Sequence, residues 1–521
     1  MKNAKILLMM AAAPAVMNAQ FGAPAPATNT TAATQLPLSG RSGQSGSAAA
    51  TQSPIPGATT SVNTLNTNIQ VTGPYSGSAS STTKAPFSAK LTLKEAIERG
   101  LSYNLGAVGL TAAVRQSQGQ ARSSRSALLP NLNGTFRENL QTENLQALGF
   151  RLPLLPALIG PFAYFDLRAT LNQTVLDITA LNNYRASKEI VAANEEAVKD
   201  ARDTIVLAVG GSYLQCIAAK ARVDSERAQI ETADAVYKQT ADRRRAGLAA
   251  QIEVNQALVK AQTEKQRLAT LQNDLSRQKI NLARLTGLPP NDNYEIADNV
   301  GFSAPPVLSV DDAVKQALDS RPDLKSAVAQ LRAAERSRSA ARAERLPSLA
   351  FSGDIGEIGP RFNQGLSTYT ISGTLKIPIW QGGRAEGDIE QSQAALDQRK
   401  AELEDAKGRI ESDVRNAYLD LQAAASQIDL ARNNQDVARE TLRLTREKFD
   451  AGISDSVEVT QADETLASAN LDYITALFAH NLAKLSLARA LGGAENRVTD
   501  YLKVQPAPAA PTGPGAPSHE F

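Results

Sequence analysis

The chain has 521 residues, enough for two to four ordinary domains, and only 5% of them are aromatic. Its 55 basic and 53 acidic residues leave a net charge of +2, so it has no field of one sign that would attract nucleic acid. The single cysteine, Cys216, excludes an internal disulfide framework and any multi-cysteine metal site.

The first 19 residues predict an export signal. Lys2 and Lys5 precede an apolar run from Ile6 to Met17, and small residues follow it. That run is too short to span a bilayer, and we expect no transmembrane helix elsewhere. The ends of the chain are of low complexity and hold few large apolar residues that could offset the entropy of ordering. We therefore expect a disordered linker over residues 20–87 and a disordered Pro/Ala-rich tail over residues 495–521.

The rest of the chain repeats itself. Residues 91–132 align without gaps with residues 308–349, an offset of 217, and Tyr213-Leu214 aligns with Tyr418-Leu419 at an offset of 205. A gapless repeat of this length indicates two copies of one structural unit. The two offsets differ by 12 residues, which predicts a longer strand connection in the first copy. We assign the units to residues 88–290 and 308–494, joined by a connection at 291–307.

Each copy begins with a predicted helix, over residues 92–128 and 309–345, ended by Pro130 and Pro347. Apolar and polar residues then alternate, which predicts two β-strands of about ten residues in each copy. The clearest apolar faces are Phe165, Leu167, Ala169, Leu171 and Val175 in the first copy, and Tyr369, Ile371, Leu375, Ile377 and Ile379 in the second.

Two very long predicted helices follow the strands in each copy, over residues 181–245 and 250–286, and again over residues 384–450 and 455–491. A helix of some 65 residues would be roughly 100 Å long at 1.5 Å per residue. Small and apolar residues recur in steps of four and three, the spacing of a coiled-coil seam that lets helices approach closely. The seam positions are Ile205, Val209, Ser212, Cys216, Ala219 and Val223 in the first copy, and Ile410, Val414, Ala417, Leu421, Ala424, Ile428 and Ala431 in the second.

The strands indicate the environment of the protein. Strands of about ten residues can cross a bilayer when tilted. Four strands cannot close a barrel, and an open sheet edge in lipid is prohibitive, so several subunits would have to share one barrel. The alternative is a small soluble sheet that caps a helical bundle.

The order of motifs in both copies resembles the TolC-like outer-membrane efflux family. The segments that carry the resemblance are Leu308 to Ala313 with Arg321-Pro-Asp-Leu324, the strand end Ile377-Pro-Ile-Trp-Gln-Gly-Gly-Arg384, the turn Phe449-Asp-Ala-Gly-Ile-Ser454 and the closing Leu487-Ala-Arg-Ala-Leu-Gly492. The first copy departs from this pattern at Leu176-Asp-Ile-Thr-Ala180, which lacks the Gly-Gly pair.

The resemblance implies a mainly α fold with β: long α-helical hairpins form a periplasmic α-barrel, and four β-strands per subunit contribute to a trimeric, 12-stranded outer-membrane β-barrel. It implies a homotrimer in outer-membrane lipid that serves as a passive exit duct in a tripartite efflux or type I secretion system. A periplasmic adaptor (a membrane fusion protein) and an inner-membrane pump would be its partners. We expect no enzymatic activity, no cofactor and no nucleic-acid partner.

Two pairs of positions at the predicted helical hairpin turns are candidate adaptor contacts by resemblance: Gly247 and Leu248, and Gly452 and Ile453. A glycine that only ends a helix would explain the same pattern. A few residues further, matching acids and amides form a candidate periplasmic gate, because carboxylate rings select cations. These residues are Glu253, Gln256, Glu458 and Gln461. A solvated helix face is the alternative.

No catalytic constellation is present in the sequence. His480 and His519 are the only histidines, so neither a metal-binding spacing nor a Ser/His/Asp triad is expected. Cys216 lies on the predicted seam and is expected to be a small core residue. One alternative to an outer-membrane duct stays open: an exported, soluble coiled-coil scaffold protein of the periplasm.

Overall fold

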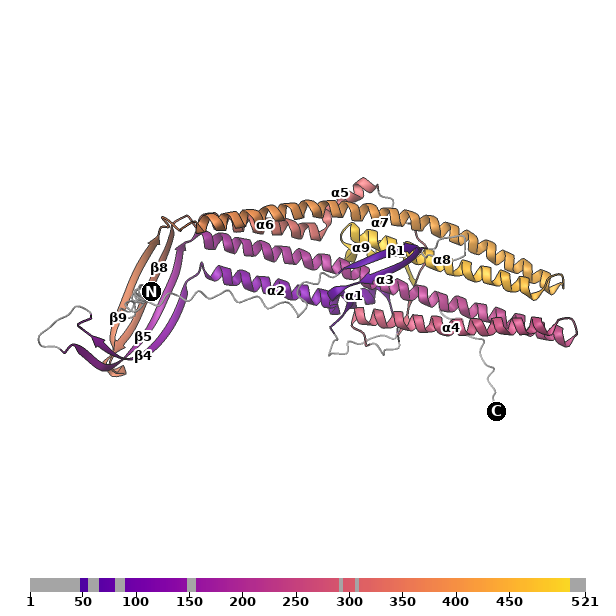
Figure 1. Ribbon diagram of the computed structural model, residues 1–521, viewed down its shortest axis with the longest axis horizontal. Helices are drawn as coiled ribbons and strands as arrows, with labels where there is room; N and C mark the ends of the chain where they lie inside the picture. Colours follow the sequence, from indigo (N-terminus) through magenta and orange to yellow (C-terminus); the bar gives the residue numbers. More distant parts are fainter. Residues whose placement is uncertain are drawn as a thin grey trace, which may run out of the picture. The chain divides into compact units, whose positions relative to one another are not determined.

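The computed structural model describes residues 47–54, 65–79, 90–147, 156–289, 294–304 and 309–506. These residues belong to one compact unit that begins at Ser45. The predicted signal over residues 1–19 lies outside the described residues, as do the remaining parts of the predicted linker and tail. Figure 1 shows a four-stranded β-sheet at one end of this unit that continues into long helices.

The predicted strands form one antiparallel sheet in the order β4-β5-β8-β9. Their bounds are Asn131–Asn144 for β4, Leu158–Leu176 for β5, Ser348–Gly359 for β8 and Leu366–Lys376 for β9. The strands of the first copy are longer than the expected ten residues. The 12 additional residues of that copy therefore enter the strands as well as the connection between them, where only residues 145–147 and 156–157 are described.

The first helical stretch of each copy is not one helix, as the sequence pattern suggested, but two. Helix α1 (Leu93–Tyr103) is followed by α2 (Leu105–Ser126), and α5 (Val310–Ser320) by α6 (Pro322–Ala343). Both breaks fall on a residue with an extended backbone, Asn104 in the first copy and Arg321 in the second. The Asn104 side chain accepts a hydrogen bond from the Gly106 backbone N–H at 2.9 Å, so it begins the next helix. Arg321 precedes Pro322, whose ring disfavours a helical backbone before it.

The long helices agree with the sequence prediction within a few residues. They are α3 (Ile178–Arg245) and α4 (Gln251–Thr286) in the first copy, and α7 (Arg384–Asp450) and α8 (Ser456–Ala490) in the second. Every predicted seam residue in α3 and α7 is buried, including Cys216. Burial raises the pKa of the Cys216 thiol to about 12, as expected for an inert core residue. One window of α3 is apolar enough to cross a membrane, but 78% of it is buried inside the protein, as in a core helix.

The helices lie side by side in a constant order that follows the order of the strands. Next to the sheet the packing order is α2-α3-α6-α7, and next to the hairpin turns it is α4-α3-α8-α7. Strand β4 and helices α2 and α4 therefore lie along one edge of the subunit, and β9 and α7 lie along the other.

The expectation of disorder is wrong for parts of both low-complexity ends. Within residues 20–87, two strands pair antiparallel and Tyr75 is buried beside the core. Within residues 495–521, a short helix packs on α8, and a strand pairs with the connection between the copies. Among the described residues of these ends, large apolar side chains pack in the core, namely Ile69, Val71, Tyr75, Val498, Tyr501 and Leu502. The elements concerned are β1 (Ala48–Pro54), β2 (Leu65–Val71), the 3-10 helix η2 (Gly73–Ser76), α9 (Ala494–Tyr501) and β10 (Val504–Pro506).

Short strands join the two copies beside the middle of the helices. The two residues of β3 (Lys90–Leu91) pair in parallel with β6 (Glu295–Ile296), and β7 (Asp298–Val300) pairs with β10. A hydrogen bond from the Tyr213 hydroxyl to the Leu91 backbone oxygen, 2.9 Å long, ties α3 to these strands. The core of the unit lies here, where α1, α3, α4, α5, α7, α8 and α9 all contribute buried side chains.

Candidate functional site

The four-stranded sheet has one apolar and one polar face. Strand register aligns Leu132, Leu171, Gly353 and Ile371 in one row across the sheet. Many side chains of this face are exposed, with Ile371 69% and Tyr369 76% accessible. In a water-soluble protein such a face would be covered, so its exposure indicates an apolar surrounding.

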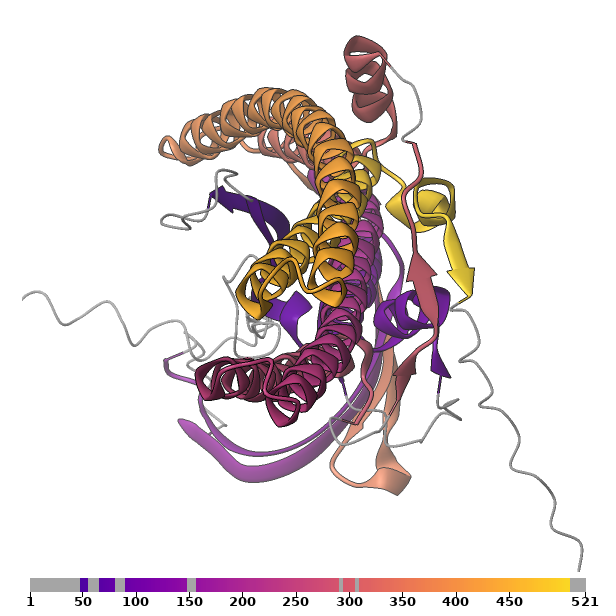
Figure 2. The ribbon, with the colours of Figure 1, turned by 90° about the vertical axis from the view of Figure 1, so that its right-hand side faces the viewer.

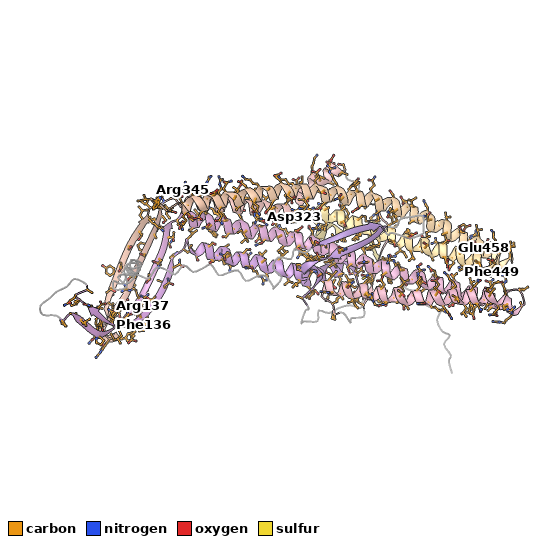
Figure 3. The ribbon with its side chains drawn as sticks, in the orientation of Figure 1. Phe136, Arg137, Asp323, Arg345, Phe449 and Glu458 are labelled. Atoms are coloured by element: carbon orange, nitrogen blue, oxygen red, sulfur yellow. The ribbon has the colours of Figure 1, made fainter. Side chains whose placement is uncertain are left out.

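The opposite face carries polar and charged groups. Arg168 on β5 forms an ion pair with Asp166 at 3.2 Å and a second with Asp354 on the neighbouring strand β8. Phe136 and Arg137, labelled in Figure 3, are consecutive residues of β4, so strand geometry places their side chains on opposite faces of the sheet. The sheet thus has the alternation of a membrane barrel wall, apolar outside and polar inside.

Both outer strands of this sheet are open. Strand β4 pairs only with β5, and β9 pairs only with β8, in the part of the chain that the structure describes. Each open edge presents a row of backbone N–H and C=O groups that can pair with another strand. Their lengths of 14 and 11 residues suit such pairing.

The hairpin turns of both copies have the same geometry. Gly247 and Gly452 each adopt φ of +75°, the left-handed conformation that ends a helix. The next residue returns a backbone hydrogen bond to the helix in each case, from Leu248 to Arg243 at 2.8 Å and from Ile453 to Lys448 at 2.9 Å. A glycine C-cap therefore accounts for both glycines. It does not account for the apolar side chains after them, since Leu248 is 71% and Ile453 80% exposed.

The predicted gate residues begin the second helix of each hairpin. The Glu253 carboxylate accepts a hydrogen bond from the Ala250 backbone N–H at 3.2 Å, and the Glu458 carboxylate accepts one from the Ser454 hydroxyl at 2.7 Å. Both acids thus have a local role at a helix N-terminus, where negative charge is favourable. Gln256 and Gln461 are exposed one turn further on. Within one subunit the two pairs belong to separate hairpins.

A groove separates the two hairpins near their turns. It has a volume of about 440 Å³, and α3 and α7 provide most of its lining. Arg446 of α7 donates a hydrogen bond to the Thr232 hydroxyl of α3 at 3.0 Å, and the Arg243 guanidinium lies 4.8 Å from the centre of the Phe449 ring. These contacts join the two hairpins, although the turns themselves stay exposed. Figure 3 shows Phe449 and Glu458 in this region.

A buried pair of glutamates is the feature that sequence reasoning missed. Glu226 of α3 and Glu264 of α4 are only 2% and 3% exposed. Lys260 bridges Glu264 at 2.6 Å to Glu464 of α8 at 3.0 Å, and Arg267 approaches Glu226 at 3.5 Å.

Burial, followed by the hydrogen bond and charge of Glu264, raises the pKa of Glu226 to about 7. The pair exists only in the first copy, because the positions 205 residues further along are Ala431 and Ala469. That difference between the copies is the sequence signal that could have revealed it.

Comparison with known proteins gives the family. The sequence profile of the outer membrane efflux protein family matches residues 110–288 and 313–493, well over half of the chain. The chain belongs to the outer membrane efflux protein family. The two matched segments fall on the two copies recognised in the sequence, so each copy corresponds to one unit of the family profile.

Among efflux-family relatives, the pyoverdine export outer membrane protein OpmQ of Pseudomonas aeruginosa is 26% identical over 321 residues. That match covers 58% of this chain, and the chain spans 64% of the length of OpmQ. The outer membrane protein OprJ of the same organism is 23% identical over 410 residues, which cover 77% of this chain and 84% of OprJ. The crystal structure of the Campylobacter jejuni CmeC outer membrane channel shares the fold, with a TM-score of 0.67, 17% identity and coverage of 87% of this chain and 98% of CmeC.

The efflux family assignment confirms the expected resemblance, the mainly α fold with β, and the location in the outer membrane with a helical periplasmic part. The family is one of outer membrane channels, which are not enzymes. The roles predicted for the hairpin turns and for the gate residues are not decided by family membership.

Proposed function

We propose that this protein is the passive outer-membrane exit duct of a tripartite efflux or type I secretion system, and that it acts as a homotrimer. The proposal rests on one observation: the subunit is four elements wide along its whole length. Four strands lie side by side in the sheet, four helices lie side by side next to the sheet, and four lie side by side next to the hairpin turns. All three layers end at the same two edges. A subunit of this kind is a segment of a tube.

The helical edges carry matching apolar seams. On α4, Ile252, Val259 and Ile280 are exposed at multiples of seven residues. On α7, exposed apolar side chains recur at seven-residue intervals at Leu430, Val437 and Leu444. Seven-residue spacing is the pattern by which one helix packs against another in a coiled coil. The α4 edge of a second copy is therefore the partner that we propose for α7.

The strand count supports three subunits. Closed membrane barrels need about eight strands or more, so one four-stranded subunit is too few. Three subunits would provide twelve strands, with β4 of one subunit paired to β9 of the next. The shortest of the four strands, β9, has 11 residues and would be roughly 36 Å long at about 3.3 Å per residue, enough to cross the hydrocarbon core when tilted.

The exposed hairpin turns supply a docking surface for a periplasmic adaptor. An inner-membrane pump would be the third component of the system. Leu248 and Ile453 are the apolar contacts that we propose, with Gly247 and Gly452 shaping the turns. OpmQ is named for pyoverdine export and OprJ as an outer membrane protein. The cargo of the present chain is not fixed by such names, because a passive duct leaves selection to the pump.

We further propose that the acids next to the turns form a selective ring at the periplasmic mouth. Three copies of Glu253 and Glu458 would place six carboxylates near one another, followed by Gln256 and Gln461 one turn away. Hydrogen bonds to Ala250 and Ser454 hold both carboxylates in place at the helix starts. Carboxylates fixed in this way would favour cations.

A soluble scaffold fits the structure less well. It would leave the apolar face of the sheet, including Leu132 and Leu140 at 73% and 74% exposure, in contact with water. Burial of such side chains is worth about 25 cal/mol per Å², so a soluble sheet would aggregate or acquire a cover.

Reconstitution into planar bilayers tests the duct directly. We expect stable ion conductance from a detergent-extracted oligomer that dissociates on heating in gel electrophoresis. A protein that washes off membranes with salt and conducts no ions would contradict the proposal.

Docking is tested by crosslinking in cells from Leu248→Cys or Ile453→Cys, in a Cys216→Ala background. Lys315→Cys on α5, an exposed position away from the turns, is the matched control. A heteromeric product that forms from the turn positions, but not from the control, would identify the adaptor. Equal yields from all positions would contradict docking at the turns.

A further inference from the structure

The hairpin formed by β1 and β2 lies in an unusual position on the helical layer. Its strands pair from Ala48↔Val71 to Pro54↔Leu65, and its base is closed by a hydrogen bond from the Thr72 N–H to the Ser47 backbone oxygen at 2.8 Å. The hairpin packs on α3 and α8, the two central helices of the layer.

Gly211 in α3 makes room for this hairpin. A Cβ added to Gly211 would lie 3.5 Å from the Cβ of Ile69 on β2 and 3.1 Å from a methyl group of Leu482 on α8. The contact is therefore possible only because position 211 has no side chain. Two adjacent glycines can bend a helix, but α3 continues unbroken through Gly210-Gly211, and both glycines serve close packing.

The hairpin lies on the opposite face of the layer from the short strands that join the copies. Successive helical residues are about 100° apart, so residues two apart point in nearly opposite directions. Gly211 faces Ile69 of the hairpin, whereas the Tyr213 hydroxyl donates a hydrogen bond to the Leu91 backbone oxygen of β3.

The same relation holds on α8. Leu482 lies beside the hairpin, whereas the Lys484 ammonium bonds the Ser303 hydroxyl at 2.6 Å in the connection between the copies. Two independent helices thus place the hairpin and the connecting strands on opposite faces.

Figure 2 shows which of these faces is concave. The helices form an arc, the β1–β2 hairpin lies in its hollow, and α5, α9 and β10 lie on the outer, convex side. If three subunits close into a tube, as in the function proposed above, the concave face lines the pore. We infer that the β1–β2 hairpin lies inside the duct, where three copies narrow the pore at the middle of its helical part.

The chemistry of the hairpin suits a pore lining. Its strands read AAATQSP and LNTNIQV, a sequence with hydroxyl and amide residues and no charge. Gln70 is exposed, while Ile69 and Val71 on either side of it pack on the core. Three copies of the exposed Gln70 amide would hydrogen-bond to polar cargo without favouring either sign of charge, and the added strands would restrict solutes by size.

The test introduces one thiol at Gln70. Gln70→Cys is made together with Cys216→Ala, purified as the assembled protein and reconstituted in planar bilayers. A bulky methanethiosulfonate reagent is then added while single-channel conductance is recorded, and mass spectrometry confirms labelling. Asp311→Cys on α5, an exposed position on the convex side, is the matched control.

We expect labelling at position 70 to lower the single-channel conductance by roughly half, reversibly on reduction, because added bulk in a constriction obstructs ion flow. Labelling at position 311 should leave the conductance unchanged. Confirmed labelling of both positions with no change at position 70, or with equal changes at both, would overturn the inference. If the unlabelled protein forms no channel, it is instead the proposed function that fails.

Two further variants keep the inference testable if Gln70→Cys does not assemble. Ile69→Cys removes the methyl group that a side chain at position 211 would meet. Combined with Gly211→Cys, it brings two Cβ atoms to about 3.5 Å, within the range of a disulfide, so oxidation should lock the hairpin in place and keep the conductance at its wild-type level. Removal of residues 45–71 should raise the conductance. An unchanged or lower conductance after removal would contradict a pore position.

Discussion

Helices α3 and α7 are copies of one another, yet they meet different surroundings. They have 68 and 67 residues, and they share the buried seam in which Ile205 corresponds to Ile410. Away from the seam they differ. Leu214 of α3 is 3% exposed, whereas its counterpart in α7, Leu419, is 61% exposed.

Position in the layer explains this difference. Helix α3 has neighbours on both sides, α4 or α2 on one and α8 or α6 on the other. Within the layer, α7 has α6 or α8 on one side and no helix on the other, in the part of the chain that the structure describes, while the short α5 packs on its convex side. The same ancestral surface is thus core in one copy and, in our account, subunit interface in the other. In the assembled protein, we expect a second subunit to bury the exposed leucine and valine side chains of α7.

The largest effect should come from a charge on the open edge. Val437→Asp puts a carboxylate where we expect an apolar contact between subunits, and burying it would cost several kcal/mol in each of three interfaces. We predict loss of the heat-sensitive oligomer and of conductance, while circular dichroism of the subunit stays helical. Val437→Ile is the control and should assemble normally. Assembly of the Asp variant would show that α7 faces solvent.

Leu214 and Leu419 should respond differently to the same substitution. Leu214→Ala should destabilise the folded subunit by about 3 kcal/mol, the usual cost of a large-to-small change in a core. Leu419→Ala should change subunit stability by less than about 0.5 kcal/mol, since its side chain is exposed in one subunit. It should instead lower the temperature at which the oligomer dissociates. Chemical unfolding and heated gels separate the two effects, and equal unfolding shifts would contradict the account.

A smaller effect is expected in the pH dependence of folding stability, because only the first copy holds the buried glutamate pair. The Glu226 carboxyl has its pKa raised to about 7 in the folded protein, first by burial and then by Glu264. A raised pKa means that the folded state holds the proton more tightly than the unfolded state. The stabilisation is therefore complete below about pH 4.5, the ordinary pKa of the group, and is lost as the pH rises to about 7.

Glu226→Gln should remove this part of the pH dependence and raise the melting temperature at pH 8 by about 2–4 °C. Glu231→Gln, which changes an exposed glutamate of the same helix, should have no such effect. Thermal melts between pH 5 and pH 8 measure both. A Glu226→Gln variant whose stability falls with pH as steeply as the wild type would refute the assignment of this transition to the pair.

The smallest effect on stability is expected at the hairpin starts. Glu253→Gln and Glu458→Gln keep an oxygen acceptor for the capping hydrogen bonds, so the stability should change by less than about 0.5 kcal/mol. Loss of charge should nevertheless reduce the preference of the channel for cations, measured as the reversal potential in a salt gradient. An unchanged reversal potential would leave both acids with a capping role alone.

Much of this fold follows from the sequence because its signals are periodic and duplicated. The alternation in β9 and the seam in α7 each rest on several residues that repeat one physical pattern. The seam is confirmed, and so is the strand up to Lys376, whereas Ile377 and Ile379 lie beyond the end of β9, where Pro378 interrupts the pattern. The break at Arg321 was missed although Pro322 marks it, because the apolar pattern continues on both sides of the break.

Other features depend on contacts between segments far apart in the chain. Nothing near Ile69 indicates that it packs at Gly211, and nothing near Glu226 indicates that Glu264 faces it. A polar, low-complexity composition describes most of residues 20–87, but the apolar Ile69, Val71 and Tyr75 are enough to order the parts that dock. The open edges, too, emerge only when the strand and helix orders are known.

In the assembled protein, we expect the α4 edge of one subunit to meet the α7 edge of the next. Val259→Cys and Leu444→Cys, combined with Cys216→Ala, place one thiol on each edge at similar distances from the hairpin turns. Treatment with a bifunctional thiol reagent of about 10 Å, the spacing of packed helices, should then yield a covalent ladder on denaturing gels. We expect bands of one, two and three subunits, with the trimer as the largest product and no ladder from either single variant. A protein that stays monomeric after complete thiol labelling, or a ladder that continues beyond three, would contradict it.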